Sequence, residues 1–138
     1  MGKMIGIDSS VLIYLWEKNP EFLTSARRIL QTIERGDYCG VFSIIGIIEI
    51  FTGVKSQNRY DLVPIYRNLI KNFPNLIVAG ITERVVDISS DLRAMYKLRT
   101  PDAIHIATAI DFGADEFITN DDALRKIKEI KITLLRSL

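Results

Sequence analysis

The sequence predicts an α/β fold of three layers (α/β/α), in which helices cover both faces of a mainly parallel, five-stranded central sheet. Short apolar runs alternate along the chain with longer segments whose apolar residues recur at helical spacing. Strands that alternate with helices are joined by right-handed crossovers, so neighbouring strands run parallel. A chain of 138 residues has the length of one domain, and we expect residues 1–138 to form it.

The first half of the chain contains two predicted strands and three predicted helices. Apolar runs mark the strands, while caps, helical spacing and a terminal glycine mark the helices. In chain order these elements are a strand at Met4–Ile7, a helix capped by Ser9 or Ser10 through Trp16, a helix over Phe22–Ile33 that stops at Gly36, a strand at Gly40–Phe42, and a helix from a Ser43 cap to about Gly53.

The second half continues the alternation and includes one helix that is apolar on nearly every side. That helix begins with Thr100 as cap and Pro101 at its first position, and a helix apolar all round is a buried one. The predicted elements are a helix capped by Asp61 with Pro64 in its first turn, a strand at Leu76–Val78, a helix from Thr82 to about Tyr96, the buried helix from Thr100 to Gly113, a strand at Glu116–Thr119, a short helix at Ala123–Ile130, and a strand at Ile132–Leu135.

Composition and charge exclude several classes of protein. Lys and Arg number 18 against 17 for Asp and Glu, so any basic surface must be local. Cys39 is the only cysteine, which excludes an intramolecular disulfide and favours a reducing cytoplasm. The longest apolar stretch, Val41–Phe51, is interrupted by Glu49 and is too short to span a bilayer. The N-terminal residues lack the apolar core of a signal peptide, so we expect no membrane association.

Four acidic residues stand where a carboxylate is hard to explain structurally. Asp8 and Asp121 follow the first and fourth predicted strands, Asp102 lies in the first turn of the buried helix, and Glu49 lies in the second turn of the helix after strand two. In parallel sheets ligands bind beyond the carboxyl ends of the strands. We therefore expect all four carboxylates at one rim of the sheet.

Each aspartate also has a purely structural interpretation. Asp8 and Asp121 are possible helix caps, and Asp102 is favoured by the dipole of its helix by about 0.3–1 kcal/mol. Glu49 is harder to explain in this way, because it interrupts the run Ile44–Phe51 and its neighbours one turn away include Gly46 and Gly53. A buried carboxylate without a partner costs several kcal/mol or loses its charge.

Oxygen ligands without thiolate or imidazole suit hard cations such as Mg²⁺ or Mn²⁺. A cation held by such a cluster can activate water and clamp a phosphate, which favours phosphodiester hydrolysis. His105 is the only histidine, so histidine-rich zinc motifs are excluded. It either faces the site one turn after Asp102 or is an ordinary core histidine. Ser9, Ser10, Thr119 and Asn120 adjoin the carboxylates and either orient water or metal or serve as caps and turns.

At these residues the sequence resembles PIN-domain proteins, and most of all the virulence-associated protein C (VapC) toxins of type II toxin–antitoxin modules. The four matching blocks occur in family order and cover the chain from end to end. They are Ile7–Ile13, Ser43–Glu49 with Thr52–Val54, Arg99–Ala109, and Gly113–Asp115 with Phe117–Asp121.

The resemblance implies a PIN-like, Rossmann-like fold and a Mg²⁺- or Mn²⁺-dependent endoribonuclease. It assigns the catalytic and metal-binding positions to Asp8, Glu49, Asp102 and Asp121, and the supporting positions to Ser9, Thr119 and Asn120; Asp122 stays outside this set. It also implies a homodimer and a cognate antitoxin whose tail enters the acidic groove. Apolar residues of the helices after strands two and three, including Ile65, Tyr66 and Ile70, are candidates for the dimer or antitoxin surface or for ordinary core packing.

Two rival functions remain open at this stage. One is a PIN-type nuclease of RNA processing or quality control, and the other is a metal-binding or partner-binding module without turnover. Contact with RNA requires basic groups near the carboxylates. The candidates are Arg93, Lys97 and Arg99, with Arg27 and Arg28 as a second cluster, although a solvated helix face explains such charges more often than a phosphate contact does.

Overall fold

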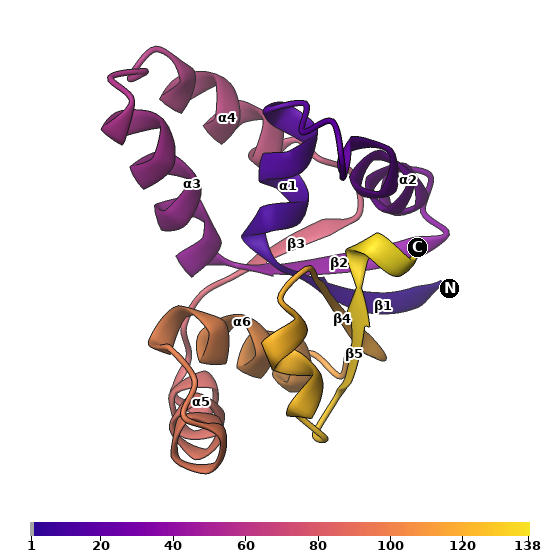
Figure 1. Ribbon diagram of the computed structural model, residues 1–138, viewed down its shortest axis with the longest axis vertical. Coiled ribbons are helices and arrows are strands. Elements are labelled where there is room, and N and C mark those ends of the chain that lie inside the picture. Colours follow the sequence, from indigo (N-terminus) through magenta and orange to yellow (C-terminus); the bar gives the residue numbers. More distant parts are fainter. Residues whose placement is uncertain (1) are drawn as a thin grey trace.

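A computed structural model describes residues 2–138 and contains the predicted three layers. Five parallel strands form one sheet in the order β3-β2-β1-β4-β5, with helices on both faces (Figure 1). The strands are β1 (Lys3–Ile7), β2 (Tyr38–Ser43), β3 (Leu76–Ala79), β4 (Glu116–Thr119) and β5 (Lys131–Leu134). The prediction of a parallel five-stranded α/β sheet is confirmed.

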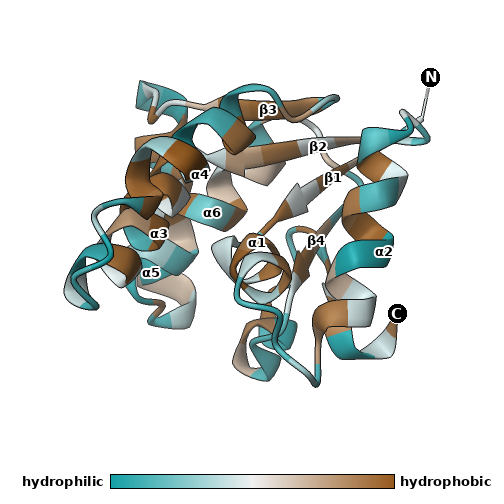
Figure 2. Cartoon of the chain, turned by 90° about the horizontal axis from the view of Figure 1, so that it is seen from above, coloured by the Kyte–Doolittle hydropathy of each residue, from teal (hydrophilic) through white to brown (hydrophobic). Residues whose placement is uncertain are grey.

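Two apolar cores lie on opposite faces of this sheet. The first four helices pack over one face, and the last two α-helices pack over the other (Figure 1). The helices are α1 (Ser9–Trp16), α2 (Leu23–Glu34), α3 (Ile44–Ser56), α4 (Leu62–Lys71), α5 (Glu83–Tyr96) and α6 (Thr100–Asp111). Two short 3₁₀ segments follow, η1 (Asp122–Lys126) between β4 and β5, and η2 (Leu135–Ser137) after β5. Figure 2 shows hydrophobic strands between helices such as α2, whose residues alternate between hydrophobic and hydrophilic.

The α6 helix lies close against the central strand because Gly6 has no side chain. A Cβ at Gly6 would stand 2.5 Å from the Cβ of Ala109, in the last turn of α6. Residues Ala103–Ala109 of α6 are all buried, as the apolar pattern predicted. This close contact sets the distance of α6 from β1.

Three predicted caps are wrong. Asp8, and not Ser9 or Ser10, caps α1 by accepting from the backbone N–H of Ser10 at 3.3 Å. Asp61 stands at the start of α4 but makes no capping bond, because its carboxylate is engaged by Arg59. Thr100 is the first residue of α6 and does not cap it. Ser43 and Thr82 do cap α3 and α5.

The helix predicted at Ala123–Ile130 is also wrong. Residues Asp122–Lys126 form one 3₁₀ segment, and the chain becomes extended at Ile127. Leu124, Ile127 and Ile130 are buried, so the apolar residues of this segment reach the core without forming an α-helix.

Of the two interpretations given for the apolar residues of α4, core packing holds for two residues and surface exposure for one. Ile70 is buried and Tyr66 stacks on Trp16 at 4.7 Å, so both belong to the core. Ile65 is exposed, together with Ile44 and Ile48 of α3. Within residues 2–138, no helix combines the length and the apolar character that crossing a membrane requires.

Candidate active site at the carboxyl ends of the strands

Asp8 lies at the end of the central strand, where the sheet order reverses between β1 and β4. Both of its carboxylate oxygens are held from within the protein. Oδ1 accepts from the backbone N–H of Ser10 and from the hydroxyl of Ser9, and Oδ2 accepts from the hydroxyl of Thr119 at 2.8 Å. The topological switch point of a parallel sheet is the usual place for a ligand crevice. Asp8 therefore combines the structural role of a cap with a fixed position at this crevice.

Thr119 links the ends of the two central strands. Its side chain is fully buried, and its hydroxyl both donates to Asp8 and accepts from the backbone N–H of Asp121 at 3.2 Å. Asp121 in turn caps η1, since its Oδ1 accepts from the N–H of Ala123 at 3.0 Å, while Oδ2 makes no hydrogen bond within residues 2–138. One threonine thus sets the position of two carboxylates.

Glu49 reaches the same place from α3. Its Oε1 lies 3.1 Å from the hydroxyl of Ser9, whose one hydrogen is shared between Glu49 and Asp8, and 2.6 Å from Nε2 of His105. Oε2 of Glu49 makes no hydrogen bond within the described chain. The hydrogen bond from His105 lowers the pKa of Glu49 by more than burial raises it. Because an ionised carboxylate only accepts, Nε2 is the protonated ring nitrogen of His105.

His105 is therefore both a core histidine and a neighbour of the site. Its ring is 3% exposed and stacks beside Phe42 at 5.9 Å, and Nδ1 has no hydrogen-bond partner. Gly46 makes room for this pair, because a Cβ there would stand 2.1 Å from Cζ of Phe42 and 3.0 Å from Cε1 of His105. The space beside Gly46 is therefore filled by the rings of Phe42 and His105.

Asp102 lies in the first turn of α6, where the helix dipole favours a negative charge. Its carboxylate is 13% exposed and accepts both arms of the Arg99 guanidinium, with Nε to Oδ2 at 3.0 Å and Nη2 to Oδ1 at 3.3 Å. The Arg99 side chain itself is 76% exposed. The Asp102 carboxylate is thus fixed by the fold, and the Arg99 guanidinium is the movable partner of the pair.

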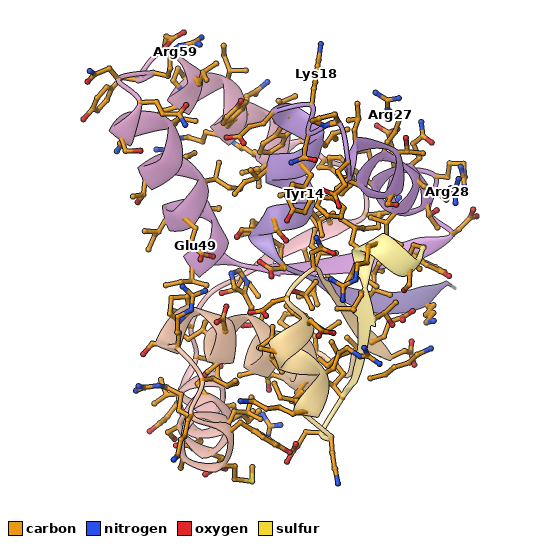
Figure 3. All side chains as sticks on the ribbon, in the orientation of Figure 1. Tyr14, Lys18, Arg27, Arg28, Glu49 and Arg59 are labelled. Atoms are coloured by element: carbon orange, nitrogen blue, oxygen red, sulfur yellow. The ribbon has the colours of Figure 1, made fainter. Side chains whose placement is uncertain are left out.

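The four predicted carboxylates line one cleft of about 300 Å³. Figure 3 shows Glu49 near the end of α3 that adjoins the sheet, on the face of the sheet that α1 also covers. The lining residues are Asp8, Ser9, Ser10, Tyr14, Glu49, Arg99, Asp102, Asn120 and Asp121, while Thr119 lies buried beneath them. A larger hollow of about 600 Å³ beside β5 offers basic side chains and no acidic one.

The carboxylates share the cleft without touching one another. Within residues 2–138, no three acidic, histidine or cysteine side chains are arranged closely enough to hold a metal ion together. Clustered carboxylates repel, and each of these accepts from a donor of the protein instead. Asn120 contributes a further oxygen acceptor, because its Oδ1 is buried without a hydrogen-bond partner.

Comparison with known proteins identifies the family of the chain. The family model of the PIN domain matches residues 5–130. This chain belongs to the PIN domain family. No sequence among curated proteins matches the chain.

Several solved structures share the PIN fold of this chain at low sequence identity. VapBC2 from Rickettsia felis, bound to a DNA fragment of its promoter, aligns with a TM-score of 0.77 at 15% identity over 95% of this chain and 98% of that one. DNA-bound VapBC from Salmonella typhimurium gives 0.74 at 18% identity over 98% and 99%. VapC20 from Mycobacterium tuberculosis, a toxin that cleaves the sarcin-ricin loop, gives 0.71 at 13% identity over 94% and 99%.

Sequence reasoning missed Tyr14 as a lining residue of this PIN-domain cleft and left the role of His105 open. Tyr14 follows Ser10 by one helical turn, which was a usable signal once α1 was placed. Of the basic candidates, Arg99 alone lines the cleft, while Arg93 donates to the carbonyl of Leu98. Arg27 and Arg28 lie on α2, on the far side of α1 from Glu49 (Figure 3). Of the five basic candidates, Arg93 and Arg99 are the two whose side chains make hydrogen bonds within the described chain.

Proposed function

We propose that this PIN-domain chain is a Mg²⁺- or Mn²⁺-dependent endoribonuclease and the toxin of a VapBC-type toxin–antitoxin module. The observation that carries the proposal is the single cleft into which four separate elements bring Asp8, Glu49, Asp102 and Asp121. The fold likeness to solved toxins, one of which cleaves the sarcin-ricin loop, supports the choice of RNA as substrate.

The cleft offers the ligand chemistry of a hard divalent cation, and binding would draw its carboxylates together, because within residues 2–138 no three of them already stand close enough to hold an ion. The acidic side chains of the cleft offer carboxylate oxygens as metal ligands, and Asn120 adds a buried amide oxygen that has no hydrogen-bond partner. Glu49 Oε2 and Asp121 Oδ2 are free of hydrogen bonds within residues 2–138. We infer that the four carboxylates hold the cation and that Ser9, Thr119 and Asn120 support them.

The chain's own residues prepare the chemistry. When bound, the cation supplies positive charge that activates water and stabilises the negative charge developing on the phosphate. Thr119 and Ser9 hold the Asp8 carboxylate in place, so its position is set before the substrate arrives. His105 keeps Glu49 ionised by lowering its pKa, which leaves a negatively charged oxygen available in the cleft.

A protein partner would bind outside this cleft as well as in it. Ile44, Ile48 and Ile65 are exposed apolar side chains on α3 and α4, and they support a surface for an antitoxin or for a second copy in a homodimer. VapBC and FitAB structures with this fold were solved as toxin–antitoxin complexes on DNA, which supports a cognate antitoxin here. Cys39 is a free thiol, in keeping with action in the cytoplasm.

The test is cleavage of RNA by purified protein with Mg²⁺, with Mn²⁺ and with a chelator. The Asp121→Asn variant keeps a capping side chain for η1 but removes a charge from the cleft. We expect it to lower the cleavage rate about a hundredfold or more. Its matched control is Asp122→Asn, since Asp122 is next in sequence, faces Arg125 and Arg136 instead, and does not line the cleft.

Each result separates the alternatives. Cleavage that requires the metal and is lost only in Asp121→Asn supports the nuclease. Equal cleavage by wild type and Asp121→Asn would point to a contaminating enzyme and contradict the proposal. Metal binding without any cleavage would favour a binding module, and cleavage without toxicity in cells would favour an RNA-processing nuclease.

A further inference from the structure

Arg99 is the only cation among the residues that line the acidic cleft. It stands at the N-cap position of α6, three residues before Asp102, and grips both oxygens of that carboxylate. A guanidinium fork takes up one lone pair on each oxygen of a carboxylate, so a metal ion approaching from that side has to compete with it. Arg99 therefore supplies the positive charge beside Asp102.

In this ion pair the Arg99 side chain can move away, whereas the Asp102 side chain is held in place. The Asp102 carboxylate is held on a buried helix against β1, whereas the Arg99 side chain is 76% exposed and makes no other side-chain hydrogen bond within residues 2–138. Exposed ion pairs are weak, because water and salt screen them and both side chains lose freedom. A divalent cation with several carboxylate ligands has a much larger electrostatic gain and would displace the guanidinium.

Arg99 interacts with the charges of other carboxylates of the cleft as well as with Asp102. After the hydrogen bond and charge of Asp102, the charges of Glu49 and Asp121 also raise the pKa of the Arg99 guanidinium. Once a metal neutralises these carboxylates, the nearest partner for a freed guanidinium is an anion in the cleft. Arginine matches a phosphate group with two parallel hydrogen bonds.

We propose that Arg99 has two successive partners, which rests on the metal-dependent ribonuclease proposed above. In the metal-free protein it holds Asp102 as a stand-in cation. After a divalent metal takes that carboxylate, the guanidinium turns to a phosphate of the RNA bound in the cleft. Arg99 is then both a competitor of the metal and a contact of the substrate.

Two variants of Arg99 separate these roles. Arg99→Ala removes both, and Arg99→Lys keeps the charge but loses the fork that fits a carboxylate. The matched control is Arg59→Ala, because Arg59 makes a similar fork to Asp61 at 3.0 Å for both bonds. Figure 3 shows Arg59 at the end of α3 that is far from Glu49.

The first measurement is Mn²⁺ binding by calorimetry without RNA. We expect Arg99→Ala to bind Mn²⁺ about two- to fivefold more tightly than wild type, which is the range set by an exposed ion pair. Arg99→Lys should bind more tightly as well, and Arg59→Ala should equal wild type. Circular dichroism melting confirms that each variant is folded.

The second measurement is the KM for an RNA oligonucleotide at saturating Mn²⁺. We expect Arg99→Ala to raise KM about tenfold. The slope of log KM against log salt should fall by about 0.7, the value for one phosphate contact on a single strand. Arg99→Lys should lie near wild type in both, because its charge still reaches the phosphate. A merely structural role would leave the salt slope unchanged.

The outcomes distinguish this inference from the function on which it rests. If wild type neither binds Mn²⁺ nor cleaves RNA, the proposed function itself fails. If wild type does both but Arg99→Ala binds Mn²⁺ equally or more weakly, Arg99 is not a competitor of the metal. An unchanged KM and salt slope would exclude the phosphate contact.

Discussion

His105 Nε2 lies 2.6 Å from Glu49 Oε1, so the only imidazole of the chain holds a carboxylate of the cleft from inside the protein core. The contact joins α6 to α3 across 56 residues of sequence. It makes the position and charge of Glu49 depend on a residue that does not line the cleft.

Replacing His105 should therefore impair the site through Glu49. We expect His105→Leu to weaken Mn²⁺ binding or cleavage about ten- to a hundredfold, the usual cost of losing a hydrogen-bond partner behind a metal ligand. His105→Gln offers a donor at a similar place and should retain more of both. Mn²⁺ titration and initial cleavage rates check this. Two variants indistinguishable from wild type would contradict the role given to His105.

Two glycines of α3 should respond to alanine in opposite directions. Gly46→Ala drives a methyl group into Phe42 and His105, and we expect the free energy of unfolding to fall by about 1–3 kcal/mol. Gly53→Ala meets nothing within 4 Å and should gain about 0.5–1 kcal/mol from helix propensity. Urea unfolding measures both. Equal stabilisation by the two substitutions would show that the space beside Gly46 is not filled.

Thr119 provides a test of how Asp8 and Asp121 are positioned. Thr119→Val keeps the shape but removes the hydroxyl that contacts both, and we expect a loss of about 1–3 kcal/mol in stability together with weaker Mn²⁺ binding. Thr119→Ser keeps the hydroxyl and should preserve the Mn²⁺ affinity. Thermal unfolding and calorimetry measure the two effects. If valine and serine bind Mn²⁺ equally well, the hydroxyl does not organise the site.

The fold followed from local patterns, because its elements are marked by residues close together in sequence. The strand Glu116–Thr119 was predicted with its observed bounds, since an apolar run followed by Asn120 and Asp121 defines it locally. The convergence of the four carboxylates followed from the topology of a parallel sheet. Both predictions rest on rules that need no knowledge of side-chain contacts.

What could not be predicted depends on contacts between distant residues. The Glu49–His105 pair joins two helices, and nothing near either residue in sequence indicates it. Asp61 has the right residue type and position for a cap, but Arg59 competes for its carboxylate. Ile70 belongs to the apolar stripe of α4 in sequence, and only the packing of the helices shows that it is buried.

Glu116 gives a prediction about pH that lies outside the cleft. Burial raises the pKa of this carboxyl, but hydrogen bonds from Lys3 and Thr133 outweigh burial and hold it below the ordinary 4.5. A pKa lowered by folding stabilises the protein above the unfolded pKa, and this stability is lost as the pH falls through the folded value. We expect Glu116→Gln to cost about 1–3 kcal/mol at pH 7.

The difference between wild type and Glu116→Gln should shrink as the pH falls below about 4. Urea unfolding at pH 7 and at pH 3.5 measures it. Asp37→Asn is the control, because Asp37 forms only an exposed pair with Arg35 and should change stability by less than about 1 kcal/mol. A difference that grows toward acid would reverse the sign worked out for Glu116.

The location of bound metal tests the account most directly. A crystal soaked in Mn²⁺ and measured at the manganese absorption edge reveals the ion by its anomalous scattering. We predict a peak in the cleft between Asp8, Glu49, Asp102 and Asp121, with the Arg99 guanidinium moved off Asp102. A peak elsewhere, or no peak at a concentration that supports cleavage, would contradict the claim that these carboxylates hold the catalytic metal.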